Sequence, residues 1–340
     1  MTKPTLLLFF GHGWAASSPL AYTLQRLTKY CHLGWVKNFN YLKNILDRDI
    51  LPENVLFDKI RNNKLTLDQW YDFATNTGHK INCPTDLKPL EGFDLDEYIF
   101  NPVSIDRYIK YYKTLWNHVE PYGYKAVADF TAFNAENPLH PNRKNCLTKS
   151  VVDQLSEHFN LKSICIVRDP VRRALSQYSR CRDLKSHPPG YQPLYLDYIH
   201  YFDLQKRLIP DSHMVIMEEL WGGSKRERER LSSFLDTTVE DLWPNLYTPD
   251  IGHHLTWDNT YCPTPCQVYG QSDLVITSDI YNESKAQCQY IYDKWKKRFG
   301  ILPRTWGRHI DYTKNLNYDY TAIMPYLVEK YNLDLGVSYG

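Results

Sequence analysis

The sequence predicts an α/β fold in which a central parallel sheet is flanked by helices, and two observations support this. First, four short apolar runs rich in β-branched or aromatic residues predict buried strands at Thr5–Gly11, Tyr124–Phe130, Ser163–Arg168 and His213–Glu218. Near-continuous hydrophobicity is typical of parallel strands that are covered on both faces. Second, amphipathic helical patterns alternate with these strands, as in an open α/β sheet.

The helical patterns fall between and after the strands. The expected helices are Ser18–Tyr30, Ile105–Val119, Ser150–Phe159, Val171–Cys181, Lys225–Leu235 and Asn282–Arg298. Residues 43–122 are predicted to form a mainly helical insertion, in which Leu65–Thr75 is a further helix. Residues 244–273 are rich in Pro, Gly, Asn and Thr and predict an irregular loop. We therefore expect one domain over residues 1–340.

The composition is that of a globular protein without a global charge bias. The 340 residues include 40 lysines and arginines and 39 aspartates and glutamates, which gives a net charge of +1. This balance gives no field of the kind that draws proteins to nucleic acid, so any anion site must be local. The eight cysteines follow no small-domain spacing and are expected to be mostly reduced. The run Thr5–Phe10 is too short for a signal peptide or a membrane span, so we expect a cytoplasmic protein without a transmembrane segment.

The first strand leads into a turn of small residues and the start of a helix. This anion loop consists of Gly11, His12, Gly13, Trp14, Ala15, Ala16, Ser17 and Ser18. Glycines allow backbone angles that are closed to other residues, and the free amides at a helix start favour a bound phosphate or sulfate. A purely structural turn explains the same pattern equally well. The Lys-Ser/Thr pair of a Walker A sequence is missing, which disfavours a kinase or an ATPase.

A second anion site is predicted where the third strand meets its helix. Arg168 ends that strand, Pro170 suits the first helical turn, and Ser176 lies nearly two turns further along. Arginine offers a bidentate fork for phosphate, and serine offers a hydroxyl donor. The alternative interpretation is an arginine that only pairs with Asp169 at the end of the strand.

Both segments resemble the nucleotide-binding motifs of sulfotransferases. The anion loop is similar to the pattern Gly-x-x-Lys-x-Gly-Thr-Thr-x-Leu, and its matching residues are Gly11, Ser17, Ser18 and Leu20. The later segment is similar to Arg-Asp-Pro-x-x-Arg-x-x-Ser-x-Tyr, and its matching residues are Arg168, Asp169, Pro170, Arg173, Ser176 and Tyr178. Met214–Leu220 resembles a later strand of the family, so the resemblance spans residues 5–235.

The resemblance implies a fold like that of P-loop nucleotide kinases and the donor 3′-phosphoadenosine-5′-phosphosulfate. By this resemblance the anion loop binds the 5′-phosphosulfate, while Arg168 and Ser176 bind the 3′-phosphate. The product is then adenosine 3′,5′-bisphosphate. The similarity is closest to the carbohydrate branch of the family. It implies transfer of a sulfuryl group to a hydroxyl of a carbohydrate, lipid or small-molecule acceptor.

Two positions of the anion loop depart from the family pattern. Trp14 stands where the family has a lysine, and Ala16 stands where it has a glycine. The lysine neutralises charge on the leaving phosphate, and electrostatic contacts of this kind are important in many enzymes. We expect another cation to replace it, and the candidates are Lys37, His12 and Arg308 in falling order of preference.

The family base is also replaced. The segment that begins at Lys37 resembles Lys-Glu-x-x-Phe/Tyr, but Asn38 stands where the family has its catalytic glutamate, and an amide cannot take a proton. Asp129 lies in a segment that resembles Glu-Lys-Ser/Thr-Pro/Ala-x-Tyr, with Phe130 in place of the lysine. Asp129 is therefore the first candidate for the base and His12 the second. A cap for Asp129 and a structural place in the turn for His12 are the alternatives.

Two function classes follow from these departures. The first is an active sulfotransferase with an unusual set of charges, and the second is a homologue that binds the nucleotide without transfer. His253, His254, Cys262 and Cys266 are of the residue types that bind zinc. Their spacing matches no standard zinc motif, so we expect no metal.

Overall fold

The computed structural model describes residues 3–11, 17–22, 24–25, 28–34, 88–90, 92–93, 104–135, 146–178, 197–221, 224–237, 277–303 and 306–309. Six strands in these ranges pair in parallel, in the order β2-β3-β1-β5-β6 with β4 beside β3. The strands are β1 (Thr5–Gly11), β2 (Cys31–His32), β3 (Ala126–Ala135), β4 (Cys146–Leu147), β5 (Asn160–Val167) and β6 (Ser212–Ile216). The predicted parallel α/β sheet is therefore confirmed.

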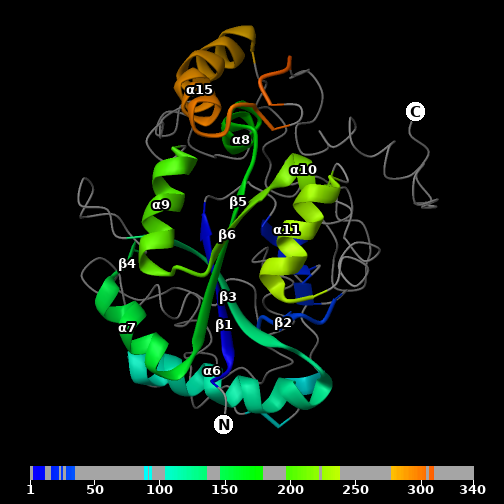
Figure 1. Cartoon of the computed structure of the whole chain (residues 1–340), viewed down its shortest axis with the longest axis vertical. Helices are drawn as coiled ribbons and strands as arrows, with labels where there is room; N and C mark the ends of the chain where they lie inside the picture. The colour runs from blue at the N-terminus through cyan, green and yellow to red at the C-terminus, as the bar shows by residue number, and fades with distance from the viewer. Residues whose placement is uncertain are drawn as a thin grey trace, which may run out of the picture.

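Helices surround this sheet (Figure 1). The α-helices are α1 (Ser17–Tyr22), α6 (Ile105–Val119), α7 (Lys149–His158), α8 (Pro170–Tyr178), α9 (Tyr198–Leu208), α10 (Met217–Trp221), α11 (Lys225–Leu235) and α15 (Ser278–Phe299). Two short 3-10 turns, η2 (Lys88–Leu90) and η3 (Glu120–Tyr122), flank α6 in the chain. In Figure 1, α8 and α15 lie together at the end of the sheet toward which β1 and β5 point.

Capping residues explain where several helices begin. In α6, α7, α9, α11 and α15 the side chain before the first helical residue accepts a hydrogen bond from a main-chain N–H of the first turn. The capping residues are Ser104, Thr148, Asp197, Ser224 and Thr277. Each satisfies an amide that has no partner within its own helix, which fixes the start of the helix.

The side chains of β1 alternate between two separate cores. Leu6, Leu8 and Phe10 pack on one face of the sheet, together with side chains of α6, α7 and α9. Leu7 and Phe9 pack on the other face, together with side chains of α1 and α11. Because neighbouring residues of a strand point to opposite faces, an uninterrupted apolar strand lies between two covered faces.

The structure corrects several expected boundaries. The helix expected at Ser18–Tyr30 does not reach Tyr30, because Lys29 has a φ of 51° and the chain turns there toward β2. The strand expected at His213–Glu218 ends at Ile216, and Glu218 lies in α10. The strands β2 and β4 and the helices α9 and α10 were not predicted. By contrast, β1, α6 and α11 have the predicted bounds.

Other predictions fall where the structure gives no description. The expected helix Leu65–Thr75 and the loop at 244–273 lie outside the described residues, as does most of the insertion at 43–122. The described part of that insertion includes α6, as expected. Within the described ranges, no helix has both the length and the apolar composition needed to cross a membrane.

Candidate functional site

The parallel sheet brings the two predicted anion-binding corners to one edge. Gly11, the last residue of β1, lies opposite Ile166 of β5, and Arg168 directly follows β5. Gly11 has a φ of 141°, a conformation that residues with a side chain rarely adopt. Ligands of open α/β sheets bind outside the carboxyl ends of the strands. Gly11 and Arg168 therefore lie at the edge where a ligand is expected.

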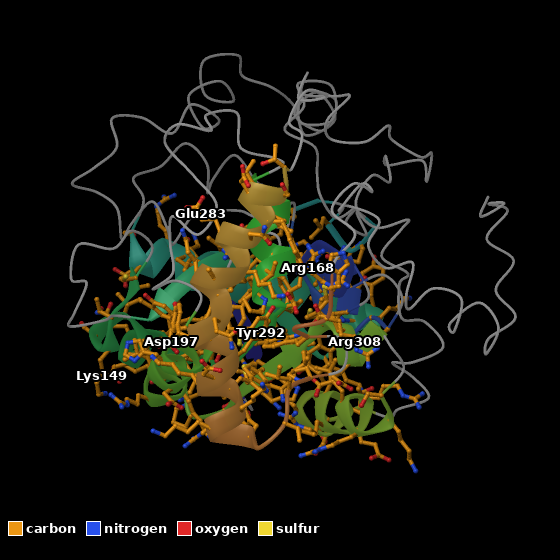
Figure 2. The ribbon with its side chains drawn as sticks, turned by 90° about the horizontal axis from the view of Figure 1, so that it is seen from above. Lys149, Arg168, Asp197, Glu283, Tyr292 and Arg308 are labelled. Atoms are coloured by element: carbon orange, nitrogen blue, oxygen red, sulfur yellow. The ribbon has the colours of Figure 1, made fainter. Side chains whose placement is uncertain are left out.

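The main chain at Arg168 is held from two other elements. The Tyr198 hydroxyl of α9 donates to the Arg168 carbonyl at 2.8 Å, and the Asp169 N–H donates to Glu218 Oε1 at 2.8 Å. This carbonyl and this N–H belong to the same peptide group. Arg168 itself is 4% exposed. Figure 2 looks down on this corner, with Arg168 and Tyr292 labelled. The orientation of Arg168 is thus set by side chains that lie far from it in the sequence.

Asp169 caps the helix that follows. Its Oδ1 accepts hydrogen bonds from the N–H groups of Val171 and Arg172, both at 3.0 Å. This is the pattern of a helix N-cap, and Pro170 occupies the first helical position, where a missing N–H costs nothing. The Asp-Pro pair of the motif therefore has a local structural reason, which is to start α8 next to Arg168.

Asp169 is also bound by the C-terminal part of the described chain. The Tyr292 hydroxyl of α15 lies 3.0 Å and 3.1 Å from the two Asp169 carboxylate oxygens, and the Gly307 N–H donates to Oδ2 at 2.9 Å. The Trp306 indole N–H donates to Glu218 Oε2 at 2.8 Å. Asp169 and Glu218 thus form a buried carboxylate pair with several donors.

Positive charge is concentrated around this carboxylate pair. Arg172 and Arg173 follow Arg168 on the first turn of α8, and all three arginines are buried. Burial lowers the pKa of Arg172, Asp169 opposes this effect, and the charge of Arg168 adds to it. Among the described residues, three guanidinium groups and two carboxyl groups lie at this corner. Such a corner attracts an anionic ligand.

Glu218 has an unusual protonation equilibrium. Burial raises the pKa of Glu218 to about 7, and the nearby charge of Asp169 adds to this rise. The hydrogen bonds from Trp306 and from the Asp169 N–H act in the opposite direction, as does the charge of Arg168. Glu218 therefore changes charge near neutral pH, and its protonation removes one negative charge from the corner.

The predicted base Asp129 lies within β3, opposite Leu8 of β1. It is 1% exposed, accepts a hydrogen bond from the Tyr108 hydroxyl of α6 at 3.0 Å, and accepts another from the Thr131 N–H at 2.9 Å. Burial raises the pKa of Asp129, while these hydrogen bonds act against the rise. A carboxylate with a raised pKa is a stronger proton acceptor when it is ionised. Its assignment as the base stays a prediction.

The residue next to Asp129 points the opposite way. Phe130 stacks on Phe9 with ring centroids 5.1 Å apart and planes 9° from parallel, inside the core that α1 and α11 cover. Phe130 replaces a lysine in the family pattern. At this position the described structure therefore offers an aromatic packing surface and no positive charge.

The remaining predicted residues are placed only in part. Ser17 begins α1, Ser18 is the next residue of that helix, and Ser176 lies on α8 nearly two turns after Pro170. The other predicted residues lie outside the described residues, and they are His12, Gly13, Trp14, Ala15, Ala16 and Lys37. The cysteines and histidines considered for zinc at 253–266 lie outside them as well.

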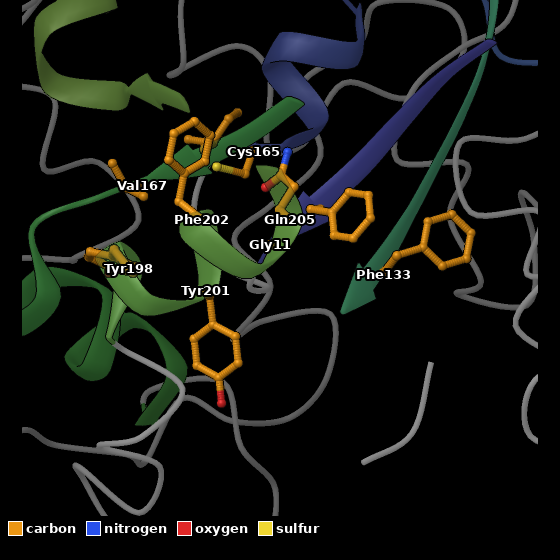
Figure 3. Close-up of a pocket in the computed structure, with 10 residues that line it drawn as sticks. Gly11, Phe133, Cys165, Val167, Tyr198, Tyr201, Phe202 and Gln205 are labelled. Atoms are coloured by element: carbon orange, nitrogen blue, oxygen red, sulfur yellow. The ribbon is translucent and has the colours of Figure 1, made fainter. Parts of the chain in front are cut away.

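A small pocket opens beside Gly11 on the α9 side of the sheet (Figure 3). Its volume is about 30 Å³. Aromatic side chains line much of it, and they include Phe10, Phe133, Tyr198, Tyr201 and Phe202. Tyr198 therefore both borders the pocket and holds the Arg168 carbonyl with its hydroxyl. The sequence did not single out Tyr198 or the other residues of α9.

Comparisons with known proteins give weak similarities. No family model and no curated protein matches the chain. A sulfotransferase domain from the curacin biosynthetic pathway is 12% identical, with a TM-score of 0.38 and coverage of 96% of this chain and 99% of that chain. A sulfotransferase domain from the olefin synthase of Synechococcus PCC 7002 is 12% identical, with a TM-score of 0.42 and coverage of 89% and 98%.

A third solved structure, a sulfotransferase from Alicyclobacillus acidocaldarius, is 14% identical, with a TM-score of 0.45 and coverage of 91% of this chain and 100% of that chain. All these identities and TM-scores are low. The activity proposed below therefore rests on the residues of this chain. The fold rests on the observed strand order and on the parallel pairing of the strands.

Proposed function

We propose that this protein is a sulfotransferase that uses 3′-phosphoadenosine-5′-phosphosulfate. One observation carries the proposal: the Arg168-Asp169-Pro170 segment, which resembles the 3′-phosphate motif, folds as a buried cationic corner at the sheet edge where β1 ends at Gly11. Three buried arginines suit an anionic group, and a second phosphate distinguishes this donor from other adenine nucleotides. Arg168 and Ser176 are assigned to the 3′-phosphate.

The anion loop is assigned to the 5′-phosphosulfate. Gly11 and Ser17 lie at its two described ends, one closing β1 and the other opening α1. Amides at the start of a helix favour an anion. The donor, when bound, supplies a sulfuryl group that passes to the acceptor oxygen as the bond between sulfur and the bridging phosphate oxygen breaks. The chain must then provide a proton acceptor on one side and a cation on the other.

We assign the proton acceptor to Asp129, with His12 as the second candidate. The cation is assigned to Lys37 first, then to His12 or Arg308. Of these, Arg308 lies in the described chain, where it is exposed and directly follows Gly307, whose N–H binds Asp169. Figure 2 labels Arg308 in the view from above the corner. This placement puts Arg308 next to a residue that contacts the donor corner.

The acceptor is proposed to be a hydroxyl of a carbohydrate, lipid or small molecule. The aromatic pocket beside Gly11 favours an acceptor that carries a ring or another apolar part. At about 30 Å³ it would hold only a part of such a molecule.

A second candidate function is donor binding without transfer. The packing of Phe130 in the core favours it, because the lysine of the family pattern has no counterpart at that position. In the sequence, Trp14 in place of the family lysine and Asn38 in place of the family glutamate also favour donor binding without transfer.

The test is an assay of radiolabelled sulfate transfer from the donor to a panel of sugars, lipids and phenols. Binding of adenosine 3′,5′-bisphosphate and of adenosine 5′-phosphate is measured in parallel. Transfer to any acceptor supports the enzyme. Selective bisphosphate binding without transfer supports the inactive homologue, and equal binding of the two nucleotides contradicts both candidates.

A further inference from the structure

We infer that Tyr292, Trp306 and Gly307 form a C-terminal clamp that positions Arg168 for the 3′-phosphate. This inference rests on the proposed function. None of the three residues belongs to the motif that resembles the 3′-phosphate site, and Trp306 and Gly307 lie well beyond the part of the chain that resembles the family. Their contacts with the Asp169 and Glu218 carboxylates connect the end of the described chain to the donor corner.

Trp306 acts on the Arg168 peptide group through Glu218. The Trp306 indole N–H binds one oxygen of Glu218, and the other oxygen accepts from the Asp169 N–H. Hydrogen bonds to both oxygens fix the plane of a carboxylate. The bond from Trp306 therefore determines where the other Glu218 oxygen lies relative to that peptide group. Glu218 is 2% exposed, so burial leaves little room for another orientation.

Tyr292 and Gly307 act on the start of α8 through Asp169. Both donate to the Asp169 carboxylate, which in turn accepts from the first-turn amides of α8. The start of α8 carries Arg172 and Arg173. The clamp therefore holds the first turn of α8 with these two arginines, as well as the main chain at Arg168. Removing one donor from a buried carboxylate leaves the charge poorly satisfied.

The packing of α15 agrees with this assignment. Trp306 contacts Trp295 with ring centroids 4.7 Å apart and Tyr198 with centroids 6.0 Å apart. Helices α15 and α8 pack directly on each other at the end of the sheet (Figure 1). The aromatic cluster therefore brings the Trp306 N–H to Glu218 and also supports the tyrosine that holds the Arg168 carbonyl.

The test compares Trp306→Phe and Tyr292→Phe with matched controls of the same residue types. Tyr292→Phe keeps its ring, Trp306→Phe keeps a smaller aromatic ring, and each variant loses one donor to the carboxylate pair. Trp116→Phe is the control for the first, because it makes the same substitution at a partly buried tryptophan of α6, at the other end of the sheet from α8 and α15 (Figure 1). Tyr290→Phe is the control for the second, because the Tyr290 hydroxyl has no partner among the described residues.

The readout is the ratio of the affinities for adenosine 3′,5′-bisphosphate and adenosine 5′-phosphate. We expect each clamp variant to lower this ratio roughly tenfold, by weakening bisphosphate binding alone. The controls should keep the wild-type ratio. Loss of stability alone weakens binding of both nucleotides and leaves their ratio unchanged, so the ratio separates positioning from folding.

A double variant tests whether the clamp acts through Arg168. In Arg168→Ala, adding Trp306→Phe should change the ratio no further, since the group being positioned is gone. An unchanged ratio in both clamp variants overturns the inference, as does an equal loss in the controls. If the wild-type protein itself does not prefer the bisphosphate, the proposed function has failed, which is a different outcome.

Discussion

Tyr198 and Glu218 hold opposite sides of one peptide group: the first binds the Arg168 carbonyl and the second binds the Asp169 N–H, each at 2.8 Å. The two residues come from α9 and α10, which lie on different sides of the sheet in Figure 1. A peptide group fixed at both its polar atoms cannot rotate without breaking a buried hydrogen bond. Arg168 is thus presented from a rigid main chain.

Replacing Arg168 by Ala should remove the preference for a 3′-phosphate. Adenosine 3′,5′-bisphosphate should raise the melting temperature of the wild-type protein more than adenosine 5′-phosphate does, because ligands stabilise the folded state that binds them. In the variant the two shifts should become equal, with a loss of about 1.5–3 kcal/mol of bisphosphate binding. Arg207→Ala, at an exposed position of α9, is the control and should keep the difference. Equal shifts in the wild type would contradict the assignment.

Glu218 should make stability fall as the pH rises toward neutral. Its pKa is raised from 4.5 to about 7 in the folded protein, mainly by burial, so the folded state holds the proton more tightly than the unfolded state. The stabilisation is complete below pH 4.5 and is lost as the pH rises to about 7, by about 1.4 kcal/mol for each unit in that window.

Glu218→Gln should lack this dependence of stability on pH. Between pH 4.5 and about 7, the free energy of unfolding of the variant should therefore rise relative to that of wild type. Denaturant unfolding at a series of pH values measures the difference. Glu219→Gln makes the same change at a less buried neighbour and is the control. Parallel curves for Glu218→Gln would show that Glu218 is ionised throughout.

His213 should make stability fall as the pH is lowered below 6.5. Burial lowers the pKa of His213 from 6.5 to about 3, and the charge of Arg230 adds to the lowering, so the folded state resists protonation. His213 stacks on Phe234 with ring centroids 5.1 Å apart, and its Nε2 lies 3.9 Å from Glu227. Its contribution to stability is complete above pH 6.5 and is lost as the pH falls toward 3.

His213→Leu should therefore lose less stability than wild type on acidification, by about 1.4 kcal/mol for each pH unit between these two values. The measurement is the free energy of unfolding by denaturant at each pH. His309→Leu makes the same change at an exposed histidine and is the control. An equal acid sensitivity of His213→Leu and wild type would show that His213 is protonated inside the fold.

The replacement of the family lysine can be tested by turnover. Lys37→Met should lower turnover at least tenfold, about 1.4 kcal/mol, and leave bisphosphate affinity nearly unchanged, because the contact strengthens as the leaving group gains charge. Arg308→Met tests the alternative. A loss in that variant with normal turnover in Lys37→Met would assign the cation to Arg308. Trp14→Lys should raise activity only if no other cation fills that position.

Much of the fold could be predicted because it depends on local pattern. The apolar run of β1 and the caps before α6 and α11 fix these elements within the sequence. The end of β6 could not be found in the same way, since the chain stays apolar as it passes from strand to α10. The helix α9 begins with aromatic residues that also suit a strand, and this hides its period.

The site could be predicted only where a motif marks it. Arg168 stands out through its neighbours in the sequence, but nothing local distinguishes Trp306 from the eight other tryptophans or Tyr292 from the other tyrosines. The clamp depends on how the end of α15 returns to the start of α8, which is a property of the whole fold. Long-range hydrogen bonds of this kind leave no periodic signal in the chain.

The clamp also determines when, during synthesis of the chain, the Arg168 corner can be completed. Gly307 follows Asp169 by 138 residues, so a chain still emerging from the ribosome exposes the Arg168 corner long before its last donors are made. Until then the buried carboxylates lack the hydroxyl of Tyr292, the indole of Trp306 and the amide of Gly307. The nascent protein can build the sheet edge early, but it completes the corner only after Gly307 has emerged.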